Sequence, residues 1–156
     1  MRRAEQVRYL VLAAQREGNR LLAAALRSIN LTPSQAEVLR LLGDHAPLTI
    51  GRVGELLVCE SGVNPSRLID RLVTAGLVHR RPGDDRRRVL LDLTEEGRRR
   101  EHRVRVIEDA LYDAIDAAGD PSAAVDYLHL LVAGSPAGNA IAARQMTAPG
   151  LVVPPA

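Results

Sequence analysis

The sequence predicts a mainly α-helical fold with a small β component, that is, an α+β protein. Apolar residues recur at spacings of three and four along most of the 156 residues, and residues that cap helices precede several of these stretches. One segment instead alternates around a Pro-Gly-Asp-Asp turn, as a hairpin does. The length suits a single domain, and a hydrophobic content of 46% is enough for it to bury a core.

The first predicted helix lies within residues 1–30 and is long for a chain of this size. Its apolar stripe has the helical period and consists of Val7, Leu10, Val11, Ala14, Gly18, Leu21, Leu22, Ala25 and Ile29. Because the stripe is longer than a helix needs to cover a small domain, we expect this segment to pack also on a second copy of the chain.

The second helix is predicted to begin at Thr32. Thr32 can cap it, Pro33 suits the first helical position, and Gln35 can complete a capping box. We expect this helix to end near Gly43. A short β-compatible stretch over 48–50 follows.

Two further helices are predicted over 51–58 and 64–75, joined by a short polar turn. Asn64 is a strong N-cap for the second of them, Pro65 fits its first turn, and Gly76 can end it in a left-handed conformation. Its apolar stripe is Leu68, Ile69, Leu72 and Val73. Burying that stripe turns outward Ser66, Arg67, Asp70, Arg71 and Thr74.

A β-hairpin follows, with strands predicted over 77–81 and 88–93 and a turn at 82–85. Its tip and second arm carry Arg86, Arg87 and Arg88. Two helices joined by a short turn and followed by a hairpin form a winged helix-turn-helix, which we assign to residues 31–94.

The C-terminal part is predicted as two helices within 95–134. The first starts at Thr94 and the second, expected to be the last, starts at Asp120-Pro121. With 1–30, these helices supply apolar stripes at both chain ends and are expected to form a dimerisation region. Residues 135–156 are rich in Ala, Gly and Pro, and we expect a weakly ordered tail with room for one helical turn near Ile141.

Duplex DNA is the expected partner. The N-terminal residues of a helix in the major groove meet base edges, which nominates Asn64, Ser66 and Arg67, with Arg71 one turn further and closer to phosphate. Residues 64–105 hold 12 arginines against seven acids, although the whole chain is only +2. The chain has arginine but no lysine, which suits DNA contacts and fits a GC-rich genome equally well.

The stretches "LTPSQAEVLRLL", "NPSRLIDRLVTAGLVHRR" and "DDRRRVLLDLTEEG" resemble the MarR family of regulators over residues 5–133. The resemblance implies a homodimer on a pseudo-palindromic site, acting as a repressor released by a small aromatic or phenolic effector. It also implies that Asp85 holds Arg87 in the minor groove, while Arg86 and Arg88 contact phosphate or solvent. Because three arginines are adjacent, that register could slip by one residue.

Other classes of function have less support in the sequence. No phosphate-binding loop, nucleophile elbow or metal-ligand spacing is present, so we expect neither an enzyme nor a cofactor. No apolar run is long enough to span a membrane and the N-terminus does not resemble a signal peptide, so we expect a cytoplasmic, nucleoid-associated protein. Only three tyrosines and no Trp or Phe are available for stacking on single strands.

Two alternatives remain open. A winged helix can serve as a protein-interaction or dimerisation module without specific DNA binding. The single cysteine, Cys59, precedes the predicted recognition helix and could act as a redox switch, but Glu60 beside it would raise the pKa of the thiol, which favours a structural role.

Overall fold

The computed structural model describes residues 1–58, 64–83, 85 and 88–146. Its elements follow the predicted order and add one helix at the end. They are α1 (Arg3–Leu26), η1 (Arg27–Ile29), α2 (Pro33–His45), β1 (Leu48–Thr49), α3 (Ile50–Leu56), α4 (Pro65–Thr74), β2 (Val78–Pro82), β3 (Val89–Leu93), α5 (Glu95–Ala117), α6 (Ser122–Val132) and α7 (Pro136–Met146). The predicted mainly α-helical winged helix-turn-helix is confirmed.

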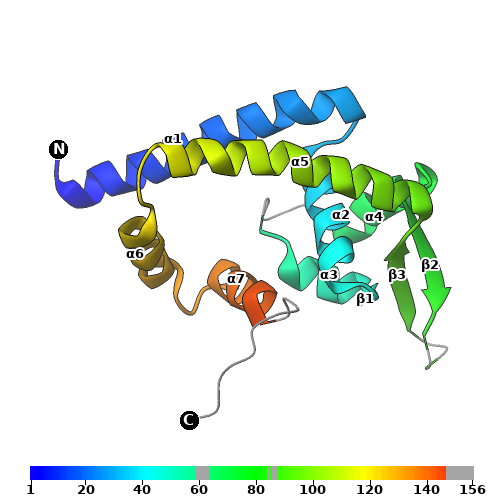
Figure 1. Cartoon of the computed structure of the whole chain (residues 1–156). Helices are drawn as coiled ribbons and strands as arrows, with labels where there is room; N and C mark the ends of the chain where they lie inside the picture. The colour runs from blue at the N-terminus through cyan, green and yellow to red at the C-terminus, as the bar shows by residue number, and fades with distance from the viewer. Residues whose placement is uncertain (59–63, 84, 86–87, 147–156) are drawn as a thin grey trace, which may run out of the picture.

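The two long helices α1 and α5 lie against each other along one side of the molecule (Figure 1). The β-hairpin projects at one end of α5, while α6 and α7 fold back beneath its other end (Figure 1). The sheet is antiparallel with the order β1-β3-β2, and Leu91 of β3 is the partner of both Leu48 and Arg80. This arrangement holds the hairpin rigidly beside the central helices.

The hydrophobic core lies within the helix-turn-helix and its immediate neighbours. Its largest fully buried side chains are Leu26, Ile29, Val38, Leu39, Leu42, Val53, Leu56, Ile69, Leu72, Val78, Leu91 and Val104. Leu26 and Val104 are the only members from the long helices α1 and α5. Leu22 and Ile107 pack against this core as well, so the parts that extend away from it are the N-terminal part of α1, the C-terminal part of α5, and α6.

The caps predicted from the sequence are confirmed. Thr32 and Gln35 form a reciprocal capping box at the start of α2, with Oε1 of Gln35 accepting from the Thr32 amide at 2.9 Å. Gly76 has a φ of +70°, the left-handed conformation that suits glycine at the end of a helix.

The predicted end of α2 near Gly43 is wrong, since the helix continues to His45. Gly43 provides space instead, because a Cβ on it would lie 2.8 Å from the carboxyl group of Glu101 on α5. The helix ends where Ala46 leaves the helical region, as expected for a residue that precedes proline.

The predicted weakly ordered tail is also wrong for residues 136–146, which form α7. This helix packs on α3, with Ala140 buried and Ala143 against the hydrophobic core. The sequence did not indicate this packing, because the residues of α7 that contact α3 and the core are the small Ala140 and Ala143 and the charged Arg144. The remainder of the tail, 147–156, lies outside the described residues.

Candidate nucleic-acid interface

Helix α4 has the orientation that its sequence predicts. Leu68, Ile69 and Leu72 are buried. Every residue predicted to face outward is exposed, namely Ser66, Arg67, Asp70, Arg71 and Thr74. The helix therefore offers a polar face along its whole length, in the form in which a recognition helix enters a major groove.

The N-terminus of α4 is capped by Asn64, whose Oδ1 accepts a hydrogen bond from the Ser66 amide at 3.0 Å. This bond uses the carboxamide oxygen of Asn64, so its exposed NH₂ group is the part left to contact DNA. Pro65, at the first helical position, lacks an N–H that would otherwise need a partner. The cap thus fixes the first turn, which carries Ser66 and Arg67.

The charges on the exposed face of α4 are arranged asymmetrically. Asp70 accepts from Nη2 of Arg80, on β2, at 2.5 Å. Within the described part of the chain, the side chains of Arg67 and Arg71 form neither a hydrogen bond nor an ion pair. The one carboxylate on this face is thus neutralised by the hairpin, and the two guanidinium groups stay available for phosphate or base edges.

The hairpin is closed by backbone hydrogen bonds around its tip. The Gly83 amide donates to the Arg88 carbonyl, and the Arg88 amide donates to the Asp85 carbonyl, both at 2.8 Å. Asp85 and Arg88 are exposed, as a role in DNA contact requires. Arg86 and Arg87 lie outside the described residues, so the proposed contact of Asp85 with Arg87 stays a prediction.

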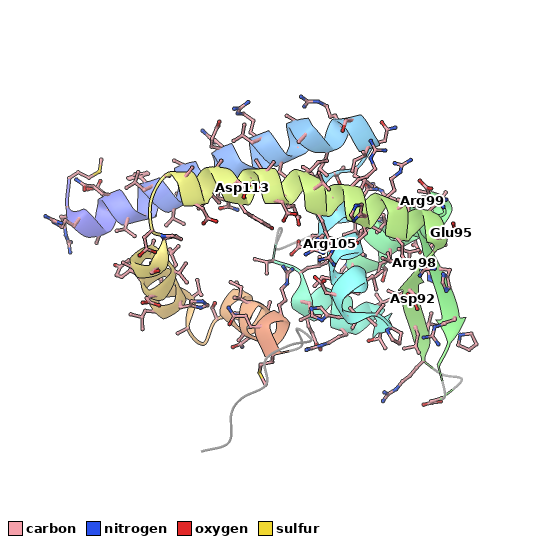
Figure 2. All side chains as sticks on the ribbon, viewed as in Figure 1. Asp92, Glu95, Arg98, Arg99, Arg105 and Asp113 are labelled. Carbon is pink, nitrogen blue, oxygen red and sulfur yellow. The ribbon has the colours of Figure 1, made fainter. Side chains whose placement is uncertain are left out.

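Three arginines at the start of α5 have structural partners. Nη1 of Arg98 donates to the carbonyl of Leu93 at 2.9 Å, and Nη1 of Arg100 donates to that of Ile29 at 2.5 Å. Arg99 pairs with Glu95 at 2.7 Å (Figure 2) and also with Glu96 at 2.9 Å. Hydrogen bonds from Arg99 and Arg100 lower the pKa of Glu96. Arg98 and Arg100 thus join α5 to β3 and η1, whereas the pairs of Arg99 lie within α5. The sequence had not singled out these arginines for DNA contact.

A network of charged side chains between α2 and α5 was missed by the sequence reasoning. Arg40 contacts Glu101 at 2.6 Å, Glu108 at 3.0 Å and Asp44 at 3.4 Å. Arg105 joins the same network through Asp44, at 2.6 Å, and Glu101, at 2.5 Å. The signal was present, because opposite charges recur at helical spacings on the two helices, but nothing in the sequence indicated that these faces meet.

A cavity of about 270 Å³ lies beside this network, between α2, α5 and α7. Its lining includes Arg40, Asp44, His45, Glu108, Tyr112 and Arg144. Burial raises the pKa of Glu108, against the attraction of Arg40. Burial and the neighbouring charge of Glu108 raise the pKa of Tyr112. The cavity is thus a mixed polar and aromatic space, as a small-molecule site often is.

Large apolar side chains are exposed on the helices that extend away from the core. They are Tyr9, Leu10, Val11, Leu12 and Leu21 on α1, Val106, Tyr112 and Ile115 on α5, and Val125, Tyr127, Leu128, Leu130 and Leu131 on α6. An apolar surface of this extent indicates an interaction face. None of the described helices has both the length and the apolar character needed to cross a membrane. Cys59 lies outside the described residues.

The comparisons with known proteins agree with this geometry. The family of winged helix DNA-binding domains matches residues 31–97. The organic hydroperoxide resistance transcriptional regulator of Bacillus subtilis is 35% identical over 98 residues, which cover 62% of this chain and 66% of that regulator. The match thus spans slightly less than two thirds of the relative's length.

Solved structures extend the similarity beyond the central domain. A mutant MarR from E. coli complexed with operator DNA is 25% identical, with a TM-score of 0.69 over 82% of this chain and 94% of that one. The MepR–DNA complex of S. aureus has a TM-score of 0.71 over 80% of this chain and 95% of that one, but at 20% identity it shows the fold alone.

Proposed function

We propose that the chain is a winged helix transcriptional regulator of the MarR family, which binds a pseudo-palindromic operator as a homodimer and represses transcription. The observation that carries the proposal is the exposed face of α4. Arg67 and Arg71 stand on it without a protein partner among the described residues, while Arg80 neutralises Asp70. A face with this charge arrangement favours an anionic partner whose groove can accept the helix.

The test is a selection of duplex DNA from a randomised pool with the purified protein, followed by anisotropy titrations on the selected site. We expect a pseudo-palindrome with half-sites one helical turn apart, about 34–36 Å. For six to ten phosphate contacts, affinity should fall by about 10³–10⁵ between roughly 50 and 200 mM salt. No selected sequence, or affinity that does not depend on salt, would favour the alternative of a protein-interaction module.

The homodimer is supported by the apolar side chains exposed on α1, α5 and α6. Leu130, at 76% exposure, and Leu131, at 55%, are typical of them. A second copy would cover these side chains and set the spacing of the two recognition helices. The double variant Leu130→Glu with Leu131→Glu should keep its helical circular dichroism but elute as a monomer in light-scattering chromatography. A wild-type monomer at micromolar concentration would contradict the dimer.

An effector site is supported by the cavity between α2, α5 and α7. Its position between α2, which belongs to the winged helix-turn-helix, and the long helix α5 suits a ligand that alters the spacing of the two lobes. The ring of Tyr112 and the polar lining fit a small aromatic or phenolic molecule. We expect phenol or benzoate to raise the Tm and to release DNA, and Tyr112→Leu to weaken both effects. If neither phenol nor benzoate raises the Tm or releases DNA, aromatic and phenolic effectors are rejected for this cavity.

A further inference from the structure

The C-terminal helix α7 packs against α3, although it lies outside the residues that match the winged helix domain (Figure 1). Its contact with α3 centres on Arg144. Nε and Nη2 of Arg144 donate to the carbonyl oxygen of Leu56 at 2.9 and 2.6 Å. Leu56 is the last residue of α3, so its carbonyl is one of those that a helix end leaves without a partner.

The same guanidinium group pairs with Glu37 of α2. The side chain of Glu37 is only 6% exposed, and its Oε1 also accepts from the Val58 amide at 2.8 Å. Oε1 of Glu37 therefore links Arg144 of α7 to the backbone of Val58, two residues after the end of α3. A buried carboxylate is costly unless a cation compensates it, so Arg144 stabilises the carboxylate that accepts from Val58.

This contact is adjacent to the interface with DNA. Helix α3 packs against the first turn of α4, because a Cβ on Gly54 of α3 would lie 3.1 Å from Cγ of Pro65, the first residue of α4, so the position of α3 determines where α4 begins. A binding constellation needs the groups behind it to be held in place as well as the groups that touch the ligand. Arg144 itself directs its donors at Leu56 and Glu37, within the protein.

We propose that Arg144 is a positioning residue for DNA recognition, which acts through Glu37 and Leu56 to fix the start of the recognition helix α4. The proposal rests on the proposed function, since it assigns to α7 a part in the specificity of that same interface. It assigns no contact between Arg144 and DNA. Loss of Arg144 should therefore weaken the specific complex and leave the non-specific complex unchanged.

The experiment compares Arg144→Ala with Arg20→Ala. Arg20 pairs with Glu17 on the exposed surface of α1, so its loss removes the same charge without touching the contacts of α7. Arg144→Ala should weaken binding to the selected operator by about 3- to 30-fold, with unchanged affinity for an unrelated duplex and an unchanged salt slope. Arg20→Ala should alter neither of the two affinities nor the salt slope.

Two other outcomes would overturn the proposal. If Arg144→Ala lowers the Tm but leaves the ratio of specific to non-specific affinity intact, α7 only stabilises the fold. If both affinities fall and the salt slope decreases by about one, Arg144 contacts a phosphate directly.

A rescue variant keeps the test valid if Arg144→Ala folds poorly. Glu37→Gln retains an oxygen for the Val58 amide but removes the charge that needs Arg144. The double variant Glu37→Gln with Arg144→Ala should therefore bind the operator more tightly than Arg144→Ala alone. Equal binding of the two would contradict an action through Glu37.

Hydrogen exchange separates this proposal from the proposed function. The Val58 amide should be protected in the wild type and should exchange faster in Arg144→Ala, whether or not DNA is bound. If the wild type binds no duplex but the exchange rate changes, the function fails and the positioning contact stands. If the exchange rate of Val58 does not change, the positioning role is wrong.

Discussion

Gly97 and Leu77 lie so close together that a Cβ on Gly97 would overlap the carbonyl oxygen of Leu77. Thr94 strengthens this junction, since its amide donates to Leu77 at 3.1 Å and its hydroxyl donates to the Gly76 carbonyl at 2.6 Å. The first turn of α5 is thereby joined to the end of the recognition helix and the start of the wing. Movement of α5 must therefore also move α4 and β2.

Gly97→Ala should destabilise the protein by about 1–3 kcal/mol, because the added methyl group meets backbone rather than a side chain that could move. Helix propensity alone predicts the opposite, a gain of about 1 kcal/mol. Gly51→Ala is the matched control, since Gly51 lies in the first turn of α3 with open space around it. Urea unfolding gives the free energy of unfolding of both variants. A Gly97→Ala protein as stable as the wild type would contradict the close approach of Gly97 to Leu77.

The sequence predicted this part of the fold well, because the signals are local. Asn64 and Thr32 cap helices through neighbours two or three residues away, and Gly76 ends α4 by its own backbone conformation. The outward face of α4 followed from its apolar period alone. Those features need no knowledge of which distant segments meet.

The features that the sequence reasoning missed all depend on distant contacts. Gly43 was interpreted as a helix end, but it makes room for Glu101, 58 positions along the chain. The apolar residues of α7 are mostly alanines that form no distinct stripe, and the helix is held in part by Arg144, whose partners lie on α2 and α3. Spacing within a segment cannot reveal such partners, because tertiary packing decides them.

Arg67 and Arg71 should differ in how their loss affects DNA binding. Arg67 is in the first turn of α4, where a bidentate contact to guanine contributes about 1–3 kcal/mol of discrimination, so Arg67→Ala should relax specificity at one base pair. Arg71 is one turn further, so Arg71→Ala should weaken all duplexes alike and reduce the salt slope by about one. Titration of the operator and of single-base variants distinguishes the two, and identical profiles would contradict these roles.

The pair of Asp70 and Arg80 should matter more for DNA binding than for folding, since both side chains are largely exposed. Arg80→Ala leaves the carboxylate of Asp70 uncompensated on the face that we propose to meet phosphate, so affinity for any duplex should fall. Asp70→Asn should restore most of that loss when it is combined with Arg80→Ala. A double variant no better than Arg80→Ala would mean that Arg80 acts by contacting DNA itself.

Glu108 should make stability depend on pH in the direction opposite to most carboxylates. Its folded-state pKa is raised, because burial disfavours the ionised form more than Arg40 favours it. The stability that this group contributes is therefore fully present below its unfolded value of 4.5 and is lost as pH rises through the folded pKa. Glu108→Gln, which mimics the protonated form, should have a higher Tm than the wild type near pH 7, and this advantage should vanish in acid.

The control is Asp109→Asn, which removes the same charge from the neighbouring exposed position on α5. Comparison of both variants with the wild type separates the effect of burial at Glu108 from the general effect of one fewer negative charge on α5. A Glu108→Gln protein less stable than the wild type near pH 7 would mean that the contact with Arg40, at 3.0 Å, outweighs burial. Glu108 would then hold α5 to α2 chiefly by its charge, and any ligand in the adjacent cavity would have to compete with that ion pair.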